Sequence, residues 1–304
     1  EANPGTVTLE YLRGLKDIGF NRISFGMQTA NPDELRLLER QHQFVDVIRA
    51  VSWARKARFD NLNLDLIFGL PGQSLETWKK SLYSALSLNP EHLAIYALSI
   101  EQGTPFEKWN QRGMLDLIDQ DLAAEMYEVA SAVLENNGYT QYEISNWAKH
   151  PGNSPLQATD NPRLACKHNL QYWHNLPYLG FGAGAHGFAN GIRTANVRSP
   201  RAYIQRLVDP RKNSSAKTEN YFPCTPATIT SQSIDIDIGI GETLMMGLRL
   251  TREGVSEKRF QERFNQSLQD TFRSEINRLE RLGLIEGVQS ESAHLRLSKN
   301  GRLL

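Results

Sequence analysis

The sequence predicts an α/β fold built on a parallel sheet, followed by a small C-terminal helical domain. Helix and strand signals alternate through residues 1–100, and residues 252–304 read as helix, helix and hairpin. The alternation is typical of β/α units, and the outline of the tail resembles a winged helix. We expect residues 1–228 to form the larger domain and residues 229–304 the smaller one.

Each predicted element of the first half has a local signal. In order, the elements are a helix from about Thr8, a strand at 22–28, a short helix begun by Asn31-Pro32, a helix at 44–57, a strand at 61–68, a helix at 74–88, a strand at 92–98, a helix at 119–136 and a strand at 141–147. Asn31 supplies a helix cap and Pro32 suits the first turn. Between 61 and 68, leucines alternate with polar residues, which is the period of a strand. These are three and a half β/α units, fewer than a barrel needs, so we expect further strands before Glu1.

The C-terminal segments are less uniform. Isoleucines alternate over 234–240 as in a strand, yet 242–248 has helical spacing, so both structures stay open there. One helical face then consists of Leu268, Phe272, Ile276, Leu279 and Leu282. Gly283 caps it, and a small hairpin follows within 284–297. Winged helices often bind DNA, but residues 252–304 mix ten basic with eight acidic side chains without a basic stripe. We therefore expect packing against the main domain and no nucleic-acid partner.

Composition limits the class of protein. The 34 basic and 34 acidic side chains cancel, so no overall field favours nucleic acid or an anionic membrane. Two cysteines do not build a disulfide framework and fit a reducing compartment, and no apolar run approaches the roughly 20 residues of a membrane span. We expect a cytoplasmic protein. The chain begins at Glu1 without a methionine, inside what reads as a motif, so we expect a fragment cut at both ends.

A motif in the second half concentrates potential metal ligands, aromatic rings and glycines. It reads CKHNLQYWH and then LGFGAGAHG. An imidazole such as that of His168 ligates iron axially, rings such as Tyr172 and Trp173 pack on a macrocycle, and glycines admit a bulky planar ligand. We therefore expect a haem or porphyrin site with His168 as the iron ligand, and Cys166 or His186 as the next candidates. A histidine between aromatic rings also occurs in ordinary cores, so a structural role stays open.

Polar side chains also stand at the ends of the predicted parallel strands, where β/α folds carry their chemistry. They are Glu1, Gln28 and Ser99, while Asp65 lies inside the strand at 61–68 and Arg40 follows a short helix toward the same edge. Two acids, an amide and a guanidinium suit a zwitterion that carries a ribose, and S-adenosylmethionine fits this description. The alternative is that Asp65 and Gln28 cap turns while Arg40 pairs with Glu39 or Glu34 on the surface.

Four motifs together resemble one protein family. They are EANPGT at 1–6, RISFGMQ at 22–28, DLIFGLPGQ at 65–73 and YEISNWA at 142–148. They resemble the radical SAM proteins related to oxygen-independent coproporphyrinogen III oxidase over nearly the whole chain. The resemblance implies a partial (β/α)6 radical SAM barrel, with its N-terminal strands missing, and a small C-terminal winged-helix-like domain. It also implies a 4Fe-4S cluster and S-adenosylmethionine, with Glu1, Gln28, Arg40 and Asp65 at contact positions.

The segment HNLQYW at 168–173 matches the H-N-x-x-Y-W motif of the haem chaperone branch of this family. This resemblance implies haem bound at His168, with Asn169, Tyr172 and Trp173 completing the site, and no catalytic residue. Haem would be delivered to acceptor haemoproteins such as respiratory enzymes, and a homodimer or peripheral contact with membrane-bound acceptors is compatible with it. The alternative within the family is the oxidative decarboxylation of coproporphyrinogen III.

One feature of the family is not in this sequence. The family's C-x-x-x-C-x-x-C cluster loop supplies three thiolates, and Cys166 and Cys224 do not replace them. We expect the cluster ligands upstream of Glu1. By itself, this chain should neither hold the cluster nor cleave S-adenosylmethionine.

Overall fold

The computed structural model describes residues 1–151, 156–157, 159–208, 222–288 and 293–303. Contacts between Cα atoms divide the chain into two units, Glu1–Ala165 with Leu303 and Cys166–Arg302. Each unit has its own hydrophobic core. The first unit ends at Ala165, earlier in the chain than the domain boundary expected after residue 228. That domain boundary stays a prediction. No helix among the described residues has the length and apolar character that a membrane crossing requires.

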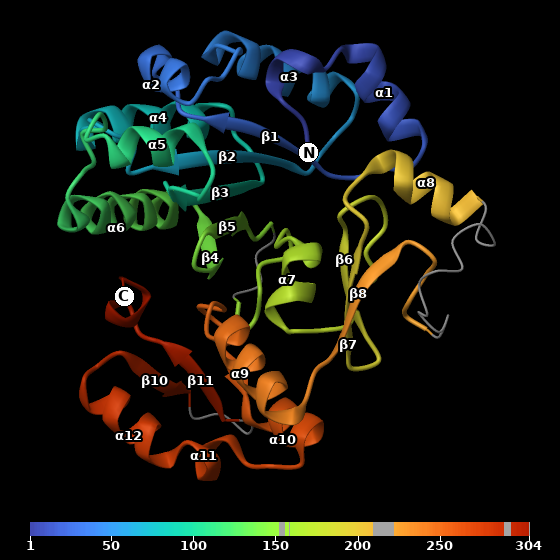
Figure 1. The fold of residues 1–304 in the computed structure, drawn as a ribbon. Helices are drawn as coiled ribbons and strands as arrows, with labels where there is room; N and C mark the ends of the chain where they lie inside the picture. The colour runs from blue at the N-terminus through green and yellow to red at the C-terminus, as the bar shows by residue number, and fades with distance from the viewer. Residues whose placement is uncertain (152–155, 158, 209–221, 289–292, 304) are drawn as a thin grey trace. The chain divides into compact units, whose positions relative to one another are not determined.

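Helices and strands alternate along the first unit (Figure 1). Its elements are η1 (Pro4–Thr6), α1 (Leu9–Asp17), β1 (Ile23–Gln28), α2 (Pro32–Leu37), α3 (Phe44–Lys56), β2 (Leu62–Phe68), α4 (Leu75–Ser87), β3 (His92–Ala97), α5 (Pro105–Gln111), α6 (Gln120–Asn136), β4 (Tyr139–Glu143) and β5 (Asn146–Lys149). The side chain of Asn31 caps α2 by accepting from the backbone N–H groups of Asp33 and Glu34. The predicted β/α alternation is thus confirmed, while α5 was not expected from the sequence.

Five strands form one mixed sheet in the order β1-β2-β3-β5-β4. Strands β1, β2 and β3 are parallel, whereas β5 is antiparallel to both β3 and β4. The single strand expected over 141–147 is wrong, because the chain reverses between β4 and β5. The carboxylate of Glu143 accepts from the backbone N–H of Ser145 at 3.1 Å and holds this tight turn.

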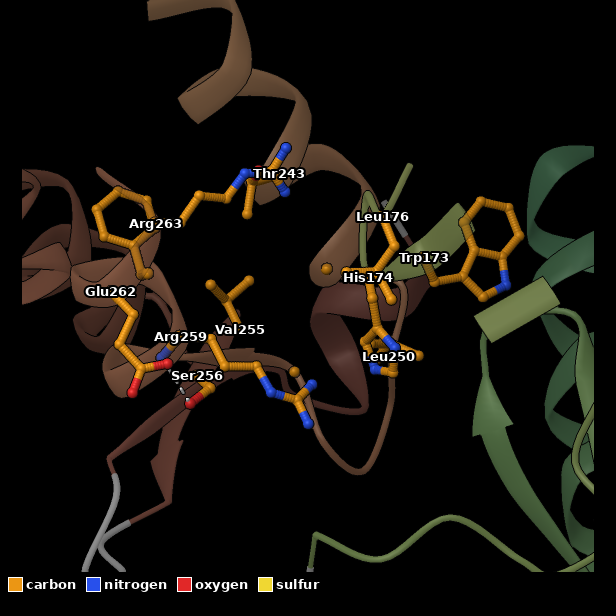
Figure 2. A pocket seen from close by; sticks show the side chains of 13 residues that line it. Trp173, His174, Leu176, Thr243, Leu250, Val255, Ser256, Arg259, Glu262 and Arg263 are labelled. Atoms are coloured by element: carbon orange, nitrogen blue, oxygen red, sulfur yellow. Dashed lines mark hydrogen bonds between the residues drawn. The ribbon is translucent and has the colours of Figure 1, made fainter. Parts of the chain in front are cut away.

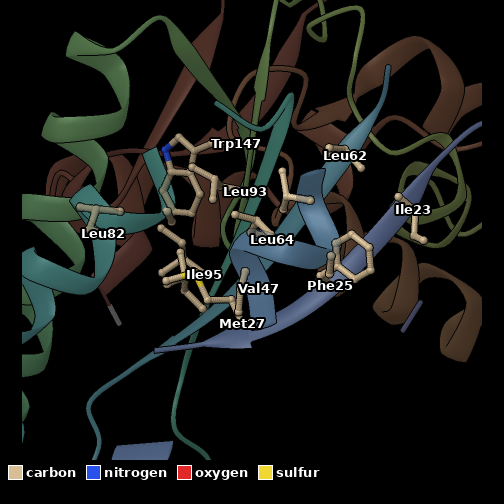
Figure 3. Close-up of a cluster of buried hydrophobic side chains, with 14 of the residues drawn as sticks. Ile23, Phe25, Met27, Val47, Leu62, Leu64, Leu82, Leu93, Ile95 and Trp147 are labelled. Atoms are coloured by element: carbon tan, nitrogen blue, oxygen red, sulfur yellow. The ribbon is translucent and has the colours of Figure 1, made fainter. Parts of the chain in front are cut away.

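The core of the first unit lies on one face of this sheet (Figure 3). Alternate residues of the strands point to it, and each is at most 4% exposed: Ile23, Phe25, Met27, Leu62, Leu64, Leu66, Leu93, Ile95 and Trp147. Helices α3 and α4 cover this face with buried side chains such as Val47 and Leu82. Full burial of a side chain of this size contributes roughly 1.5–3 kcal/mol, so the apolar face fixes the register of the strands.

The other face of the sheet carries polar side chains, because successive residues of a strand point to opposite faces. Ser24 of β1 pairs in register with Asn63 of β2, and Asn63 pairs with His92 of β3. Asp65 lies two residues further along β2, on the same face. The alternation in the sequence therefore predicts both the core and a polar surface opposite to it.

The second unit begins with the aromatic motif. Its elements are α7 (Lys167–Trp173), β6 (His186–Ala189), β7 (Ile192–Asn196), α8 (Pro200–Val208), β8 (Thr228–Ser233), α9 (Ile236–Gly247), β9 (Val255–Ser256), α10 (Glu257–Phe264), α11 (Leu268–Thr271), α12 (Arg273–Arg281), β10 (Ile285–Val288), β11 (His294–Leu297) and η3 (Asn300–Leu303). Two antiparallel sheets have the orders β6-β7-β8 and β10-β11-β9. The first of them was not expected from the sequence.

The structure resolves the ambiguity at 234–240 in favour of a helix. Asp235 caps α9 by accepting from the backbone N–H of Ile238 at 2.8 Å. The continuous helical face expected over 268–282 is interrupted at Phe272, which has φ −118° and ψ 27° and separates α11 from α12. Gly283 follows with φ +68°, as expected of a helix cap, and β10 and β11 form the expected hairpin.

Candidate functional site

A groove of about 660 Å³ follows the edge of β1 in the first unit. On the side of β1 away from β2, Ala2 forms a parallel bridge to Phe25. The bridge holds Glu1 beside the sheet. The groove is lined by four of the five polar residues expected to share this edge of the sheet, which are Glu1, Gln28, Arg40 and Asp65.

Gln28 ends β1 in a left-handed conformation, with φ 65°, and its side chain is 7% exposed. A Cβ atom on Gly26 would stand 2.7 Å from the Gln28 Nε2 atom. The glycine in the RISFGMQ motif therefore leaves room for the amide of Gln28 to lie back along the strand. A larger residue at position 26 would push this amide out of place.

The carboxylate of Asp65 is held on both oxygens. Ser24 Oγ donates to Asp65 Oδ2 at 3.0 Å, and Asn63 Nδ2 donates to Asp65 Oδ1 at 2.6 Å. Burial raises the pKa of Asp65, and these two hydrogen bonds oppose that rise. Each oxygen of a carboxylate has two acceptor positions, so one position on each remains for a ligand that donates hydroxyl groups.

Arg40 and Ser99 differ in their relation to the groove. The Arg40 Nη1 atom donates to Asn3 Oδ1 at 3.2 Å, which turns the guanidinium toward the groove. Glu34, one of the two surface partners considered for Arg40, is buried and accepts from Thr29 and Gln73. Ser99 lies two residues beyond the end of β3, is exposed, and is not among the groove-lining residues of the described chain.

The loop after β2 is fixed by Gln73, a residue that the sequence reasoning did not single out. Gln73 Oε1 accepts from the backbone N–H of Gly69 at 2.8 Å, and Gln73 Nε2 donates to Glu34 Oε2 at 3.2 Å. Burial raises the pKa of Glu34, while its hydrogen bonds with Thr29 and Gln73 lower it. The final glutamine of DLIFGLPGQ therefore ties this loop to α2.

In the second unit, α7 places the imidazole of His168 against a short aromatic stack. The rings of His168 and Tyr172 meet edge to face at 4.9 Å, and those of Tyr172 and Tyr178 at 4.7 Å. His168 and Tyr172 share one face of α7 because they are four residues apart. His168 is exposed, and within the described residues its ring nitrogens have no hydrogen-bond partner. Tyr178 was missed because it follows the H-N-x-x-Y-W motif by five residues.

The other motif residues point elsewhere. Trp173 follows His168 by five residues, which is about 140° round the helix from it. The guanidinium of Arg249 lies over the Trp173 ring, 4.4 Å from its centroid. Asn169 is half-buried on α7, about 100° round the helix from His168. The motif therefore presents His168 and Tyr172 to one side and Trp173 to another.

Trp173 lines a cavity of about 380 Å³ within the second unit (Figure 2). In this view His174 and Leu250 stand on one side of the cavity, and Val255 and Arg259 stand on the other. His174 Nε2 lies 2.8 Å from Glu253 Oε2, and Arg259 Nη1 pairs with Glu253 Oε1. Glu253 thus ties α7 to α10 beside the cavity.

The glycine-rich stretch after α7 has a structural reason as well as the expected steric one. A Cβ atom on Gly180 would stand 2.1 Å from the carbonyl oxygen of His186. Asn196 Nδ2 donates to the carbonyl oxygens of Gly180 at 3.2 Å and Gly182 at 3.0 Å. The glycines therefore allow a close approach of the chain to itself, next to Tyr178.

The other candidate iron ligands lie at the ends of elements in this unit. Cys166 is the N-cap residue of α7, and His186 is exposed at the start of β6. Both cysteines are reduced. In the part of the chain that the structure describes, no group of three or more His, Cys, Asp or Glu side chains is placed to hold a metal ion.

Comparison with known proteins shows the family of the chain. Residues 1–82 match the family model of the radical SAM superfamily, and residues 240–304 match that of the HemN C-terminal domain. The chain is 41% identical, over its full length and 72% of the relative's length, to the protein named "Heme chaperone HemW" from Bacillus subtilis (strain 168). The chain belongs to the HemW family of radical SAM proteins.

Other HemW proteins are matched over a smaller share of their length. The Lactococcus lactis HemW is 34% identical over 92% of this chain and 66% of its own length, and the Escherichia coli HemW is 39% identical over 71% of this chain and 54% of its own. The chain therefore spans between about half and three quarters of these HemW relatives.

A solved structure confirms the fold class. The structure of coproporphyrinogen III oxidase (HemN) from Escherichia coli superposes with a TM-score of 0.72 at 20% identity, over 99% of this chain and 66% of that one. At this identity the likeness concerns the fold alone. The expected radical SAM α/β fold with a small C-terminal domain is thus confirmed.

Proposed function

We propose that the full-length protein is a haem chaperone, which binds one haem through His168 and passes it to acceptor haemoproteins. The observation that carries the proposal is the exposed imidazole of His168, aligned with the rings of Tyr172 and Tyr178. An axial ligand needs an imidazole nitrogen without another partner, and an edge-to-face contact with Tyr172 holds the ring in one orientation. The "Heme chaperone" name of the relatives supports the same function.

The loop after Tyr178 adds apolar surface beside this stack. Phe181 is 82% exposed and Leu179 is 49% exposed. Large apolar side chains exposed together on one loop indicate a binding surface. In the proposal they cover the porphyrin face while His168 ligates the iron. Because Trp173 points to another side of α7, we assign it to the packing of α7 and not to contact with the haem.

The groove beside β1 suits S-adenosylmethionine. This cofactor carries an ammonium group, a carboxylate and a ribose diol. The proposal assigns the ribose hydroxyls to Asp65 and the carboxylate to Arg40, with Glu1 and Gln28 completing the polar surround. Ser99, which does not line this groove, stays a candidate for contact with the cofactor. When bound, the cofactor would supply a sulfonium that a reduced cluster can cleave.

The cluster itself does not fit the residues of this sequence. A radical SAM cluster uses three cysteine thiolates, and the 304 residues include only Cys166 and Cys224, both in the second unit. In the full-length protein the thiolates would therefore come from outside these residues. We propose that cluster and S-adenosylmethionine regulate haem transfer in the cytoplasm. Acceptors would include respiratory haemoproteins, some of them bound to membranes, and a homodimer is compatible with this role.

The test of the haem proposal is a haem titration of the full-length protein, followed through the Soret band in both redox states. We expect saturation at one haem per chain, lost in His168→Ala. The matched control is His186→Ala, an exposed histidine of the same unit, which should titrate like the parent. An unchanged Soret spectrum in His168→Ala contradicts the ligand assignment. The S-adenosylmethionine site is tested separately by Asp65→Ala, which should weaken binding of the cofactor and leave the haem titration unchanged.

A further inference from the structure

Three buried polar side chains, one each from β4, β3 and β2, form a continuous chain of hydrogen bonds that ends at Asp65. Tyr142 Oη lies 2.8 Å from His92 Nε2, and His92 Nδ1 lies 2.6 Å from Asn63 Oδ1. Asn63 Nδ2 then donates to Asp65 Oδ1 and, at 2.7 Å, to Ser24 Oγ. His92 is 1% exposed and Asn63 is 4% exposed. Buried polar atoms at these distances restrict each other to definite donor and acceptor roles.

The carboxylate of Asp65 determines the direction of every bond in this chain. An ionised carboxylate only accepts, so Asn63 must turn its Nδ2 toward Asp65 and its Oδ1 toward His92. The Oδ1 atom only accepts, so His92 must carry its proton on Nδ1. The bare Nε2 of a neutral imidazole then accepts, and Tyr142 must donate to it. All donors in the chain therefore point toward Asp65.

The surroundings of His92 keep it neutral. Burial lowers the pKa of His92 well below its usual value, and the nearby cation of Arg22 lowers it further. A protonated ring would need acceptors on both nitrogens, and Tyr142 would then have to reverse its hydroxyl. The Nδ1–H form is therefore the stable state of this ring around neutral pH.

Asp65 is surrounded by groups with opposing effects on its charge. Burial and the carboxylate of Glu1 raise the pKa of Asp65, while Asn63, Ser24 and the cation of Arg22 lower it. Tyr96, on β3, has its pKa raised to about 12, by burial first and then by Asp65, so it stays neutral. The bond from Asn63 is therefore one of few influences that favour the ionised form of Asp65.

We propose that His92 is a positioning residue for the S-adenosylmethionine site: it holds the amide of Asn63 in the one orientation that donates to Asp65, and Tyr142 fixes the tautomer of His92. This inference rests on the proposed cofactor site at the edge of β1. Without His92, the oxygen of the Asn63 amide has lost its donor, and only Ser24 and Asp65 hold the amide from its nitrogen side. The amide would then be less firmly oriented, and its bond to the carboxylate of Asp65 would weaken.

The test measures binding of S-adenosylmethionine to the full-length protein with its cluster reconstituted, by equilibrium dialysis between pH 5.5 and 8.5. For His92→Leu we expect about tenfold weaker binding at pH 7.5, and a higher pH below which binding is lost. The shift is upward because Asp65 with a weakened Asn63 donor needs a higher pH to ionise. The matched variant His92→Asn keeps a donor near the Nδ1 position and should retain affinity within about threefold. Tyr142→Phe should lie between the two.

A second measurement applies to the unmutated protein and does not depend on the cofactor. Histidine labelled with ¹⁵N should show His92 protonated on Nδ1 and bare on Nε2, without titration between pH 6 and 8. The resonance is assigned by its loss in His92→Asn. A ring protonated on Nε2, or one that titrates in this range, overturns the inference even if His92→Leu does not fold.

The outcomes separate this inference from the proposed function. If Asp65→Ala binds the cofactor as the parent does, the proposed site at Asp65 is wrong. If Asp65→Ala weakens binding but a folded His92→Leu shows the affinity and pH profile of the parent, only the positioning role of His92 is wrong. If His92→Leu and His92→Asn lose affinity equally, the imidazole acts by its bulk and the role of its Nδ1 donor is refuted.

Discussion

Gly180→Ala tests whether the glycine-rich turn supports the aromatic stack. The added Cβ atom would lie 2.1 Å from the carbonyl oxygen and 2.6 Å from the carbonyl carbon of His186, well inside van der Waals contact. Both neighbours are backbone atoms, so no side-chain rotation relieves the overlap. The turn must open by about 1 Å to restore an ordinary contact distance.

The cost of this opening follows from the bonds that close the turn. Tyr178 and Phe188 exchange two backbone hydrogen bonds, at 2.6 and 2.8 Å. Losing both hydrogen bonds costs about 1–3 kcal/mol, and overpacking costs about 1–3 kcal/mol more. We therefore expect the free energy of unfolding to fall by an amount on the order of 3 kcal/mol. Because Tyr178 moves with the turn, its contact with Tyr172 weakens and haem affinity should fall several-fold.

Urea denaturation of the full-length protein and a haem titration measure the two effects. The control is Gly241→Ala in α9, where an added Cβ meets nothing within 4 Å. Alanine there should raise stability by up to about 1 kcal/mol through helix propensity and leave haem binding unchanged. If Gly180→Ala lowers the free energy of unfolding by less than about 0.5 kcal/mol, the turn tolerates the alanine side chain. The close approach of Gly180 to His186 would then not matter for stability.

Three further predictions concern single side chains and the reaction. Tyr172→Leu should weaken haem binding by about two- to tenfold, the worth of an aromatic pair, in a fluorescence-quenching titration; unchanged affinity removes Tyr172 from the site. Glu34→Gln should gain stability relative to the parent as the pH rises from about 4, because the raised pKa of Glu34 makes its ionised form unfavourable in the folded state. Urea midpoints of the two proteins between pH 4 and 8 measure this difference in stability. A difference that narrows with rising pH contradicts the raised pKa of Glu34. The reconstituted full-length protein, incubated anaerobically with coproporphyrinogen III, should give no vinyl product by mass spectrometry, and any turnover favours the oxidase alternative.

Strand periodicity accounts for most of what the sequence predicted about the first unit. Leucines at every second position of β2 face the core, and the intervening Asn63 and Asp65 face the other side. Because a shift by one residue would exchange these faces, the pattern determines register as well as strand type. The register also brings Gln28 and Asp65 to the same groove, because Gln28 at the end of β1 pairs with Leu66, the residue after Asp65 in β2.

The contacts that the sequence did not reveal join residues far apart in the chain. Glu253 binds His174 across 79 positions, and Tyr142 binds His92 across 50. No local period links such residues. His92 was read as the first residue of a strand, and only the parallel pairing of β2 with β3 places it beside Asn63. The sheet β6-β7-β8 was missed for a related reason, because its short strands carry polar residues such as Thr228 and Ser233 with no apolar alternation.

The spacing of the H-N-x-x-Y-W motif has a physical basis in the geometry of α7. The interval of four between His168 and Tyr172 puts both rings on one face, where they meet edge to face and Tyr178 packs against Tyr172. The next residue, Trp173, falls on another side, where Arg249 lies over its ring and the cavity begins. In the proposed function, this short helix presents His168 on one side and is anchored through Trp173 on another. The sequence pattern shows only that Tyr172 and Trp173 are neighbours in the chain. The geometry of the helix places their rings on different sides of α7.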